Sequence, residues 1–167
     1  MIDPPNPAVP DDSPAGPLMK PHEDDTWYHD GLPFRCTQCG NCCTGSPGYV
    51  YVKREEIEKI AAFIGREGKG LTKKHIRRVG IRYSLTEDAR TGDCCFLRTR
   101  DGNRQCAIYP VRPLQCRTWP FWRSNLKTME SWALAAAYCP GMHYGMHHDL
   151  AAIVKRRDAK TWKDLEE

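Results

Sequence analysis

Nine cysteines are the residues of this 167-residue chain whose type and spacing could do chemistry. Four of them fall within eight residues, in the run Cys36-Thr37-Gln38-Cys39-Gly40-Asn41-Cys42-Cys43. A C-x2-C step lets two thiolates converge on one ion or cluster, and a second such step adds a third ligand from the same loop. The run therefore indicates a metal site.

The same cysteines could instead form the disulfide framework of a small secreted domain. We expect metal ligation, because the N-terminal run Met1-Ile2-Asp3-Pro4-Pro5 lacks the basic start and apolar stretch of a secretory signal, and because the cysteine count is odd. No run approaches the length of apolar sequence that crosses a membrane. These features predict a cytoplasmic protein, in which thiols stay reduced.

Charge is distributed unevenly along the chain. The formal net charge is +4, yet residues 1–30 carry seven acids against Lys20 alone, which leaves about +10 on the remainder. This basic body could meet a polyanion such as nucleic acid, or it could balance the negative charge that thiolates bring to a metal site. We favour the second explanation, because the arginines lie among the cysteines in the sequence.

The chain divides into a tail and one domain. Residues 1–26 are acidic and rich in proline, with almost no large apolar side chains, and such a segment cannot bury enough surface to fold. We expect a disordered tail over 1–26 and a cysteine-cluster metal-binding domain over 27–167. Phe34, just ahead of the cysteine run, would anchor the loop in the core.

Apolar periodicity predicts the helices that must position the cysteines. Apolar residues at i, i+3, i+4 and i+7 indicate a helix over 54–64. A second helix is expected over 73–79, capped by Thr72, and a late helix over 148–158. The run 132–138 fits a helix or a strand, and its periodicity does not decide between them.

A β-hairpin is expected where residues 94–100 and 104–109 flank an Asp-Gly-Asn turn. It would carry Cys94 or Cys95 on its first strand and Cys106 on its second. Together, the elements predict a small, irregular α+β domain organised by the metal site, with a short β-hairpin and two or three helices.

The densest basic patch is Lys73, Lys74, Arg77 and Arg78, on the expected helix over 73–79. Such a patch could contact nucleic acid, but a solvated helix face is the usual explanation of a run of cations.

The cysteine segments together resemble a known family. They are the run 36–43, the pair that opens Cys94-Cys95-Phe96-Leu97, the segment 106–121 with Cys106 and Cys116, and Cys139-Pro140-Gly141. In this order they are similar to the CxxCxxCC family, also called the YkgJ-type cysteine cluster proteins, whose domains are described as zinc- or iron-chelating. The resemblance covers about residues 34–141. A related pattern in flagellin lysine N-methylases belongs to much longer chains, so methylase activity is not carried over.

The resemblance implies eight metal ligands and leaves one cysteine spare. Cys95 falls at a variable position of the family's C-x-F-L element, so it is the expected spare residue. The implied ligands are Cys36, Cys39, Cys42, Cys43, Cys94, Cys106, Cys116 and Cys139.

Two four-cysteine centres are the working division of these ligands. Adjacent residues such as Cys42 and Cys43 are expected to point their side chains apart, which disfavours binding to one ion. Three cysteines of one loop with a remote Cys-Pro parallel the ligands of a bacterial ferredoxin cluster. The first centre would take Cys36, Cys39, Cys42 and Cys139, and the second Cys43, Cys94, Cys106 and Cys116. Thiolate sets suit Zn²⁺ and an Fe–S cluster equally well.

Arginines are the natural charge partners of such a site, since four thiolates on Zn²⁺ leave a net charge of about −2. Arg112 and Arg117 are the foremost candidates, with Arg35 and Arg123; the alternative is that they form ordinary surface ion pairs.

Aromatic and imidazole side chains complete the candidates for the site. Four aromatic residues would shield the metal from water, namely Tyr109, Trp119, Phe121 and Trp122. Three histidines are further candidate ligands, although such residues are more often exposed: His143, His147 and His148.

Three functions agree with these residues. The first is a metal-binding module, and the second is an iron–sulfur redox enzyme or electron carrier. The third and weakest is a zinc-ribbon-like nucleic-acid-binding module. The sequence contains no P-loop, no dinucleotide or zinc-protease motif and no identifiable nucleophile–base pair, so it does not decide whether the chain is an enzyme. A protein partner is compatible with the tail or the basic face, whereas nucleic acid and membrane are not the expected partners.

Overall fold

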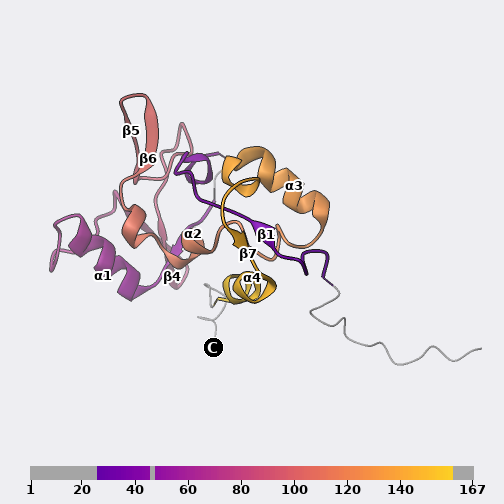
Figure 1. The fold of residues 1–167 in the computed structure, drawn as a ribbon. Coiled ribbons are helices and arrows are strands. Elements are labelled where there is room, and N and C mark those ends of the chain that lie inside the picture. Colours follow the sequence, from indigo (N-terminus) through magenta and orange to yellow (C-terminus); the bar gives the residue numbers. More distant parts are fainter. Residues whose placement is uncertain (1–25, 46–47, 160–167) are drawn as a thin grey trace, which may run out of the picture.

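Three short antiparallel sheets and four α-helices make up the described part of this computed structural model, residues 26–45 and 48–159 (Figure 1). The α+β class is confirmed, with four α-helices where two or three were expected. The tail predicted over 1–26 lies outside the described residues except for Thr26. None of the helices within the described ranges is long and apolar enough to cross a membrane.

The sheets join segments that are far apart in the chain. In the first sheet, β1 (Leu32–Pro33) pairs with β7 (His147–His148). The second has the order β2 (Tyr51–Val52), β4 (Arg82–Leu85), β3 (Ile76–Val79), and the third is the hairpin of β5 (Leu97–Arg100) and β6 (Asn103–Cys106). The predicted hairpin is confirmed with shorter strands: Cys94 and Cys95 precede β5, and Cys106 ends β6.

The predicted helix over 54–64 is confirmed as α1 (Arg54–Phe63). Its apolar stripe buries Ile60 and Ala61 completely or nearly so, as the spacing required. Glu56 caps the first turn by accepting a hydrogen bond from the Lys53 backbone N–H at 2.9 Å.

The helix expected over 73–79 is wrong, because this segment contains strand β3. Ile76 pairs with Leu85 and Val79 pairs with Arg82, and Gly80 makes the intervening turn with a φ of 60° that favours glycine. Ile76 and Val79 are β-branched, which suits a strand better than a helix. In the strand, Ile76 packs beside the buried Leu85, so pairing with β4 decided the conformation.

The run 132–138 is helical and belongs to α3 (Met129–Tyr138), and the late helix is confirmed as α4 (Leu150–Arg157). Side chains cap both helices: the Thr128 hydroxyl accepts from the Ser131 backbone N–H at 3.1 Å, and the Asp149 carboxylate accepts from the Ala152 N–H at 2.7 Å. The remaining α-helix, α2 (Leu114–Thr118), is a short one that carries Cys116.

We expect Asp149→Ala to lower the free energy of unfolding by about 1 kcal/mol, because it leaves an N-terminal amide of α4 without its partner. Urea denaturation of the metal-loaded protein measures the change. Asp149→Asn, which keeps an oxygen acceptor, should lose much less, and an equal loss in both variants would contradict the capping role.

Two hydrophobic clusters form the core. The α3 cluster joins α3 and α4 to β1, and the α1 cluster joins α1 to the second sheet and to the base of the hairpin. The buried members of the α3 cluster are Tyr28, Leu32, Phe121, Leu126, Trp132, Ala135, Ala136, Met142 and Ile153. Those of the α1 cluster are Val52, Ile60, Leu85, Phe96 and Ile108. In Figure 1 the elements of the two clusters lie on opposite sides of α2.

Candidate metal centre

A cavity of about 480 Å³, here called the sulfur cavity, takes its walls from both hydrophobic clusters. Leu85 and Ile108 of the α1 cluster line it, as do Phe34 and Trp119, which pack against the α3 cluster. Eight of the nine cysteines also line it: Cys36, Cys39, Cys42, Cys43, Cys94, Cys106, Cys116 and Cys139.

Cys95 lies outside this set. It lines a separate surface groove and directs its thiol at the backbone oxygen of His75, with a sulfur–oxygen distance of 3.4 Å. The structure thus brings together the eight cysteines that the family resemblance implied and places the expected spare residue elsewhere. Their role as ligands stays a prediction.

Backbone hydrogen bonds hold the cysteine loop against distant parts of the chain. The Cys94 N–H donates to the Cys43 oxygen at 2.8 Å, and the Arg35 N–H donates to the Gly141 oxygen at 2.9 Å. The Asn41 side-chain amide donates to the backbone oxygen of Tyr138, also at 2.8 Å. These bonds join the loop to the two later cysteine segments, Cys94-Cys95 and Cys139-Pro140.

Gly141 packs directly against the cysteine loop. A Cβ at this position would overlap the Arg35 backbone oxygen, which neighbours Cys36. We therefore expect Gly141→Ala to displace the loop from Cys139 and to lower the metal content of the purified protein at least several-fold, measured by elemental analysis. Gly65→Ala is the control: alanine there meets a left-handed φ of 71°, a backbone strain that Gly141 does not have, but open space surrounds it, so its metal content should equal that of the wild type. Normal metal content in Gly141→Ala would contradict this packing role.

The vicinal pair contradicts one expectation from the sequence. The sulfurs of Cys42 and Cys43 lie 3.9 Å apart, within the short 3₁₀ helix Asn41–Cys43, rather than pointing away from each other. Tetrahedral zinc with Zn–S bonds of about 2.3 Å separates its sulfurs by about 3.8 Å. Both residues could therefore bind one ion, and the reason given for dividing them between two centres is wrong.

The thiols are spread around the cavity and do not converge on one position. No three histidine, cysteine, aspartate or glutamate side chains of the described residues converge closely enough to hold one ion. Burial raises the pKa of Cys139, and the nearby Cys39 and Cys42 raise it further; Cys42 acts in the same way on Cys116, which the working division assigns to the second centre. Cys43 interacts with Cys106 of its own set, but also with Cys42 of the other set, whose sulfur lies 3.9 Å away. The division of ligands stays a prediction.

The thiols share protons strongly. Hydrogen bonding with Cys43 lowers the pKa of Cys42 to about 7 and that of Cys106 to about 6, and the same interactions raise the pKa of Cys43 itself. Burial raises the pKa of Cys116 to about 12. A bound metal would displace the protons that these thiols carry.

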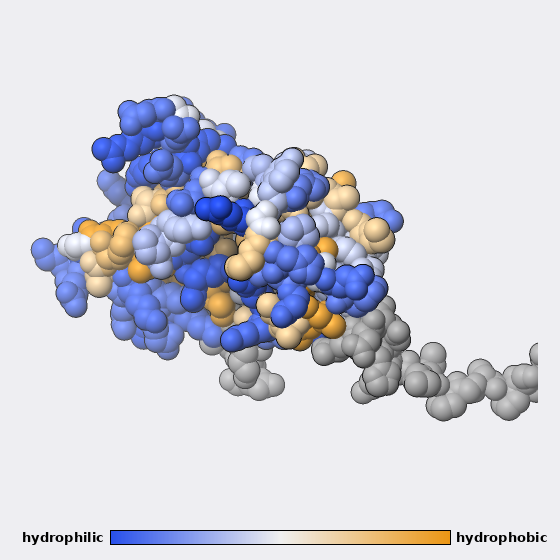
Figure 2. All heavy atoms as spheres, in the orientation of Figure 1, coloured by the Kyte–Doolittle hydropathy of each residue, from blue (hydrophilic) through white to orange (hydrophobic). Residues whose placement is uncertain are grey.

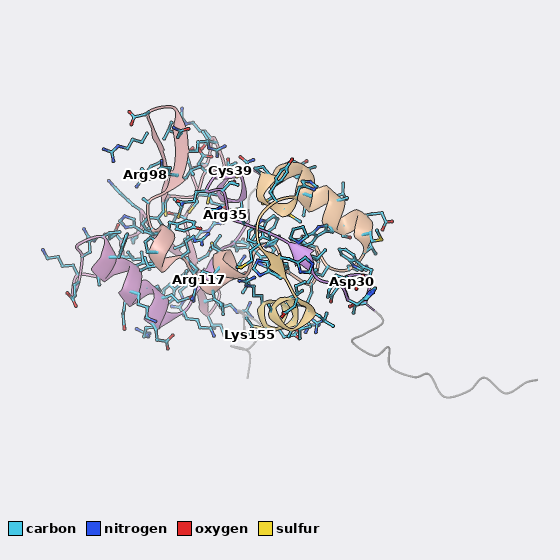
Figure 3. All side chains as sticks on the ribbon, viewed as in Figure 1. Asp30, Arg35, Cys39, Arg98, Arg117 and Lys155 are labelled. Atoms are coloured by element: carbon cyan, nitrogen blue, oxygen red, sulfur yellow. The ribbon has the colours of Figure 1, made fainter. Side chains whose placement is uncertain are left out.

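Of the four candidate arginines, Arg112 has the contact that the prediction requires. Its guanidinium lies 3.7 Å from the Cys36 sulfur and stacks on the Tyr109 ring at 3.7 Å from the ring centre. Arg117 instead pairs with Glu56 at 3.8 Å, and Arg123 pairs with Asp158. In Figure 3 Arg117 lies well away from Cys39.

The candidate aromatic residues fall into two groups. Tyr109 and Trp119 line the sulfur cavity, and the Trp119 indole N–H donates to the Cys139 sulfur at 3.4 Å. Phe121 is buried in the α3 cluster, and the Trp122 indole donates to the Gln115 oxygen. Only the first two fit the shielding role.

The three candidate histidines are not part of the cavity wall. His148 is buried, but it hydrogen-bonds to the Phe34 oxygen and to Arg156.

Sequence reasoning missed two residues that position the site. Glu56 caps α1 and also accepts the Leu114 backbone N–H at 2.6 Å, so it anchors the start of the helix that carries Cys116. Asn41 ties the cysteine loop to α3. Glu56 looked like an ordinary exposed acid on a helix, and no local signal separates it from its neighbours. The signal for Asn41 is its place inside the cysteine run, between Cys39 and Cys42.

The donor set fits a sulfur-loving metal. The residues that line the cavity include no carboxylate and no imidazole, so thiolate is the ligand type on offer. Thiolates select zinc, copper(I) and iron–sulfur clusters over magnesium and calcium. Comparison with protein families agrees: residues 35–140 match the model described as "CxxCxxCC: Putative zinc- or iron-chelating domain". The chain belongs to the CxxCxxCC family. It therefore contains a cysteine-rich domain of the zinc- or iron-chelating type.

The chain is similar to an uncharacterized protein, MJ0661, of Methanocaldococcus jannaschii. It is 31% identical to this chain over 124 residues, which cover 71% of this chain and 63% of the relative. The present chain thus spans less than two thirds of that protein's length. No solved structure matches the chain.

Proposed function

We propose that this chain is a metal-binding module that holds a polynuclear zinc or iron–sulfur centre in the sulfur cavity. The observation that carries the proposal is the gathering of eight thiols around one cavity that has no other type of ligand. The ligands would be Cys36, Cys39, Cys42, Cys43, Cys94, Cys106, Cys116 and Cys139.

A single ion would use only part of this site. A structural zinc ion takes four ligands at about 2.3 Å. The cavity offers twice that number of thiols, and they are spread around about 480 Å³. Two ions, or a cluster that brings its own bridging atoms, make better use of this arrangement.

Arg112 would balance the charge of the loaded site. Several thiolates on divalent metal leave a net negative charge, and the guanidinium beside Cys36 is held in place by the Tyr109 ring. A fixed cation next to a thiolate centre lowers the energy of the anionic form.

An iron–sulfur electron carrier is the second candidate, and the Trp119 indole favours it. Its N–H points at the Cys139 sulfur at 3.4 Å. Hydrogen bonds to ligand sulfurs, together with nearby cations, raise the reduction potential of iron–sulfur centres. A centre that only stabilises the fold gains little from such tuning.

Metal and acid-labile sulfide analysis of the full chain purified without oxygen tests both functions, with an absorption spectrum of the same sample. Iron and sulfide in similar amounts with a reversible one-electron couple would establish the carrier. Two zinc ions per chain without sulfide would establish the zinc module. Less than one metal atom per chain, before and after anaerobic reconstitution, would overturn the proposal.

A further inference from the structure

Positive charge is concentrated in one part of the domain. Residues 66–104 hold eleven lysines and arginines against five acids, although the whole chain carries only +4. This segment forms β3, β4 and the β5–β6 hairpin. The hairpin projects from the body in Figure 1, and Figure 2 shows it as a strongly hydrophilic surface.

The register of the hairpin separates its two faces. Arg98 pairs with Gln105, and Arg100 pairs with Asn103, so these four side chains share one face, and all four are exposed. We call this set the outer face. The opposite face carries Leu97 and Arg104, which lie against Gly40 of the cysteine loop. One face therefore closes the metal site, while the other presents arginines and amides to solvent.

A groove of about 650 Å³ at the base of the hairpin extends the outer face. Lys73 and Lys74 line it together with Arg98. The segment just before β3 thus shares a surface with the hairpin. The helix expected over 73–79 did not predict this shared surface. We call Lys73, Lys74, Arg98 and Arg100 the cationic track.

The acids of this groove already have partners. Glu87 pairs with Arg77, and Asp93 pairs with Arg104, each at 3.3 Å. Asp88 accepts backbone hydrogen bonds from Arg90 and Thr91.

The cationic track has no such neutralisation. Within the described ranges, none of its four side chains forms an ion pair, and the Arg98 guanidinium meets only backbone oxygens. The same positive charges act on His75. Burial lowers the pKa of His75, and the charges of Arg66, Arg98 and Lys74 lower it further.

We infer that the cationic track binds the phosphodiester backbone of a nucleic acid. Lysine and arginine neutralise phosphates, and the amides of Asn103 and Gln105 can donate to phosphate oxygens beside them. The inference goes beyond metal binding and replaces the expectation, drawn from the sequence, that the basic residues mainly balance the thiolates. Of the four arginines proposed as partners, Arg112 is the one that contacts a cysteine sulfur among the described residues, while Arg117 and Arg123 pair with acids.

The outer face favours nucleic acid over an acidic protein. Stable protein interfaces are centred on buried aromatic or aliphatic anchors. The outer face has none, since the large exposed apolar side chains of the described residues lie elsewhere, such as Ile81 in the turn between β3 and β4, and Leu134 and Tyr138 on α3. Backbone recognition of nucleic acid needs cations and hydrogen-bond donors, and the track offers both.

Fluorescence anisotropy of the metal-loaded full chain tests this inference. The probes are labelled single-stranded RNA, single-stranded DNA and duplex DNA of mixed sequence, measured at about 50 and about 200 mM salt. We expect binding at low salt that weakens steeply at high salt, and the probe bound most tightly identifies the kind of nucleic acid. No binding of any probe at low salt would overturn the inference.

Two double variants locate the surface. Lys73→Ala with Arg100→Ala leaves the Arg98 hydrogen bonds in place and should weaken binding about tenfold, with a salt slope smaller by about 1 for each lost contact. Lys59→Ala with Lys155→Ala removes the same charge from exposed positions on α1 and α4, away from the hairpin, and should retain the wild-type affinity. Equal weakening in the two variants, or equally tight binding of polyglutamate by the wild type, would contradict a nucleic-acid site on the track.

Discussion

Cys116→Ser should remove bound metal and abolish most of the cooperative unfolding transition, whereas Cys95→Ser should change neither. Both residues lie near Cys94, but Cys116 lines the sulfur cavity and Cys95 does not. Because an unfolded chain has no preformed site, the free energy of metal binding is also folding free energy, about 10–16 kcal/mol for structural zinc in small peptides. Losing a ligand forfeits much of it.

Elemental analysis and thermal denaturation of the same preparations measure this pair of effects. Cys39→Ser, from the cysteine loop, should behave like Cys116→Ser, and prolonged chelation of the wild type should reproduce the result without any mutation. If Cys39→Ser and Cys116→Ser both retained a sharp melting transition, the prediction that folding depends on metal binding would be wrong. Loss of metal from Cys95→Ser would show that the wrong cysteine was taken as spare.

Phe121→Ala should lower the free energy of unfolding of the metal-loaded protein by about 3–5 kcal/mol. Phe121 has no exposed surface and sits at the centre of the α3 cluster. Its ring stacks on Trp132 and meets Phe34 edge-on, with ring centres 5.8 Å apart in both pairs. The truncated side chain would leave a cavity beneath Phe34, which anchors the cysteine loop.

Urea denaturation gives the size of this loss, with Phe63→Ala as the matched control. Phe63 ends α1 and is 47% exposed, so its truncation should cost less than about 1 kcal/mol. Similar losses in the two variants would show that the α3 cluster does not carry the stability assigned to it.

The elements that could be predicted were those with a strong local pattern. The isoleucines of α1 repeat at helical spacing, and the turn between β5 and β6 has glycine where the chain reverses. In α3 the apolar residues surround the axis, and periodicity cannot distinguish such a helix from a buried strand. The prediction of a helix over 73–79 was wrong for another reason. The pairing of β3 with β4 depends on contacts between distant parts of the chain, and a local sequence pattern does not contain them.

The candidate site shows the same division. Cysteine spacing and family resemblance selected the eight cysteines that line one cavity, because ligand types and their order are written in the chain. The partners of the arginines were not predictable, since the pairing of Arg117 with Glu56 depends on how α1 meets α2. The closeness of the Cys42 and Cys43 sulfurs arises from a short 3₁₀ turn that the spacing alone did not reveal.

The division of the core into two clusters also bears on the order of folding. The α1 cluster contacts Cys94 and Cys106, and the α3 cluster contacts Cys139. Each cluster is small, and the cysteines that they contact line the same cavity. The two clusters can therefore behave as separate foldons in the metal-free chain, with amide protons that exchange independently. Metal would fuse them into one cooperative unit, so this domain would report its own metal status through the rigidity of its backbone.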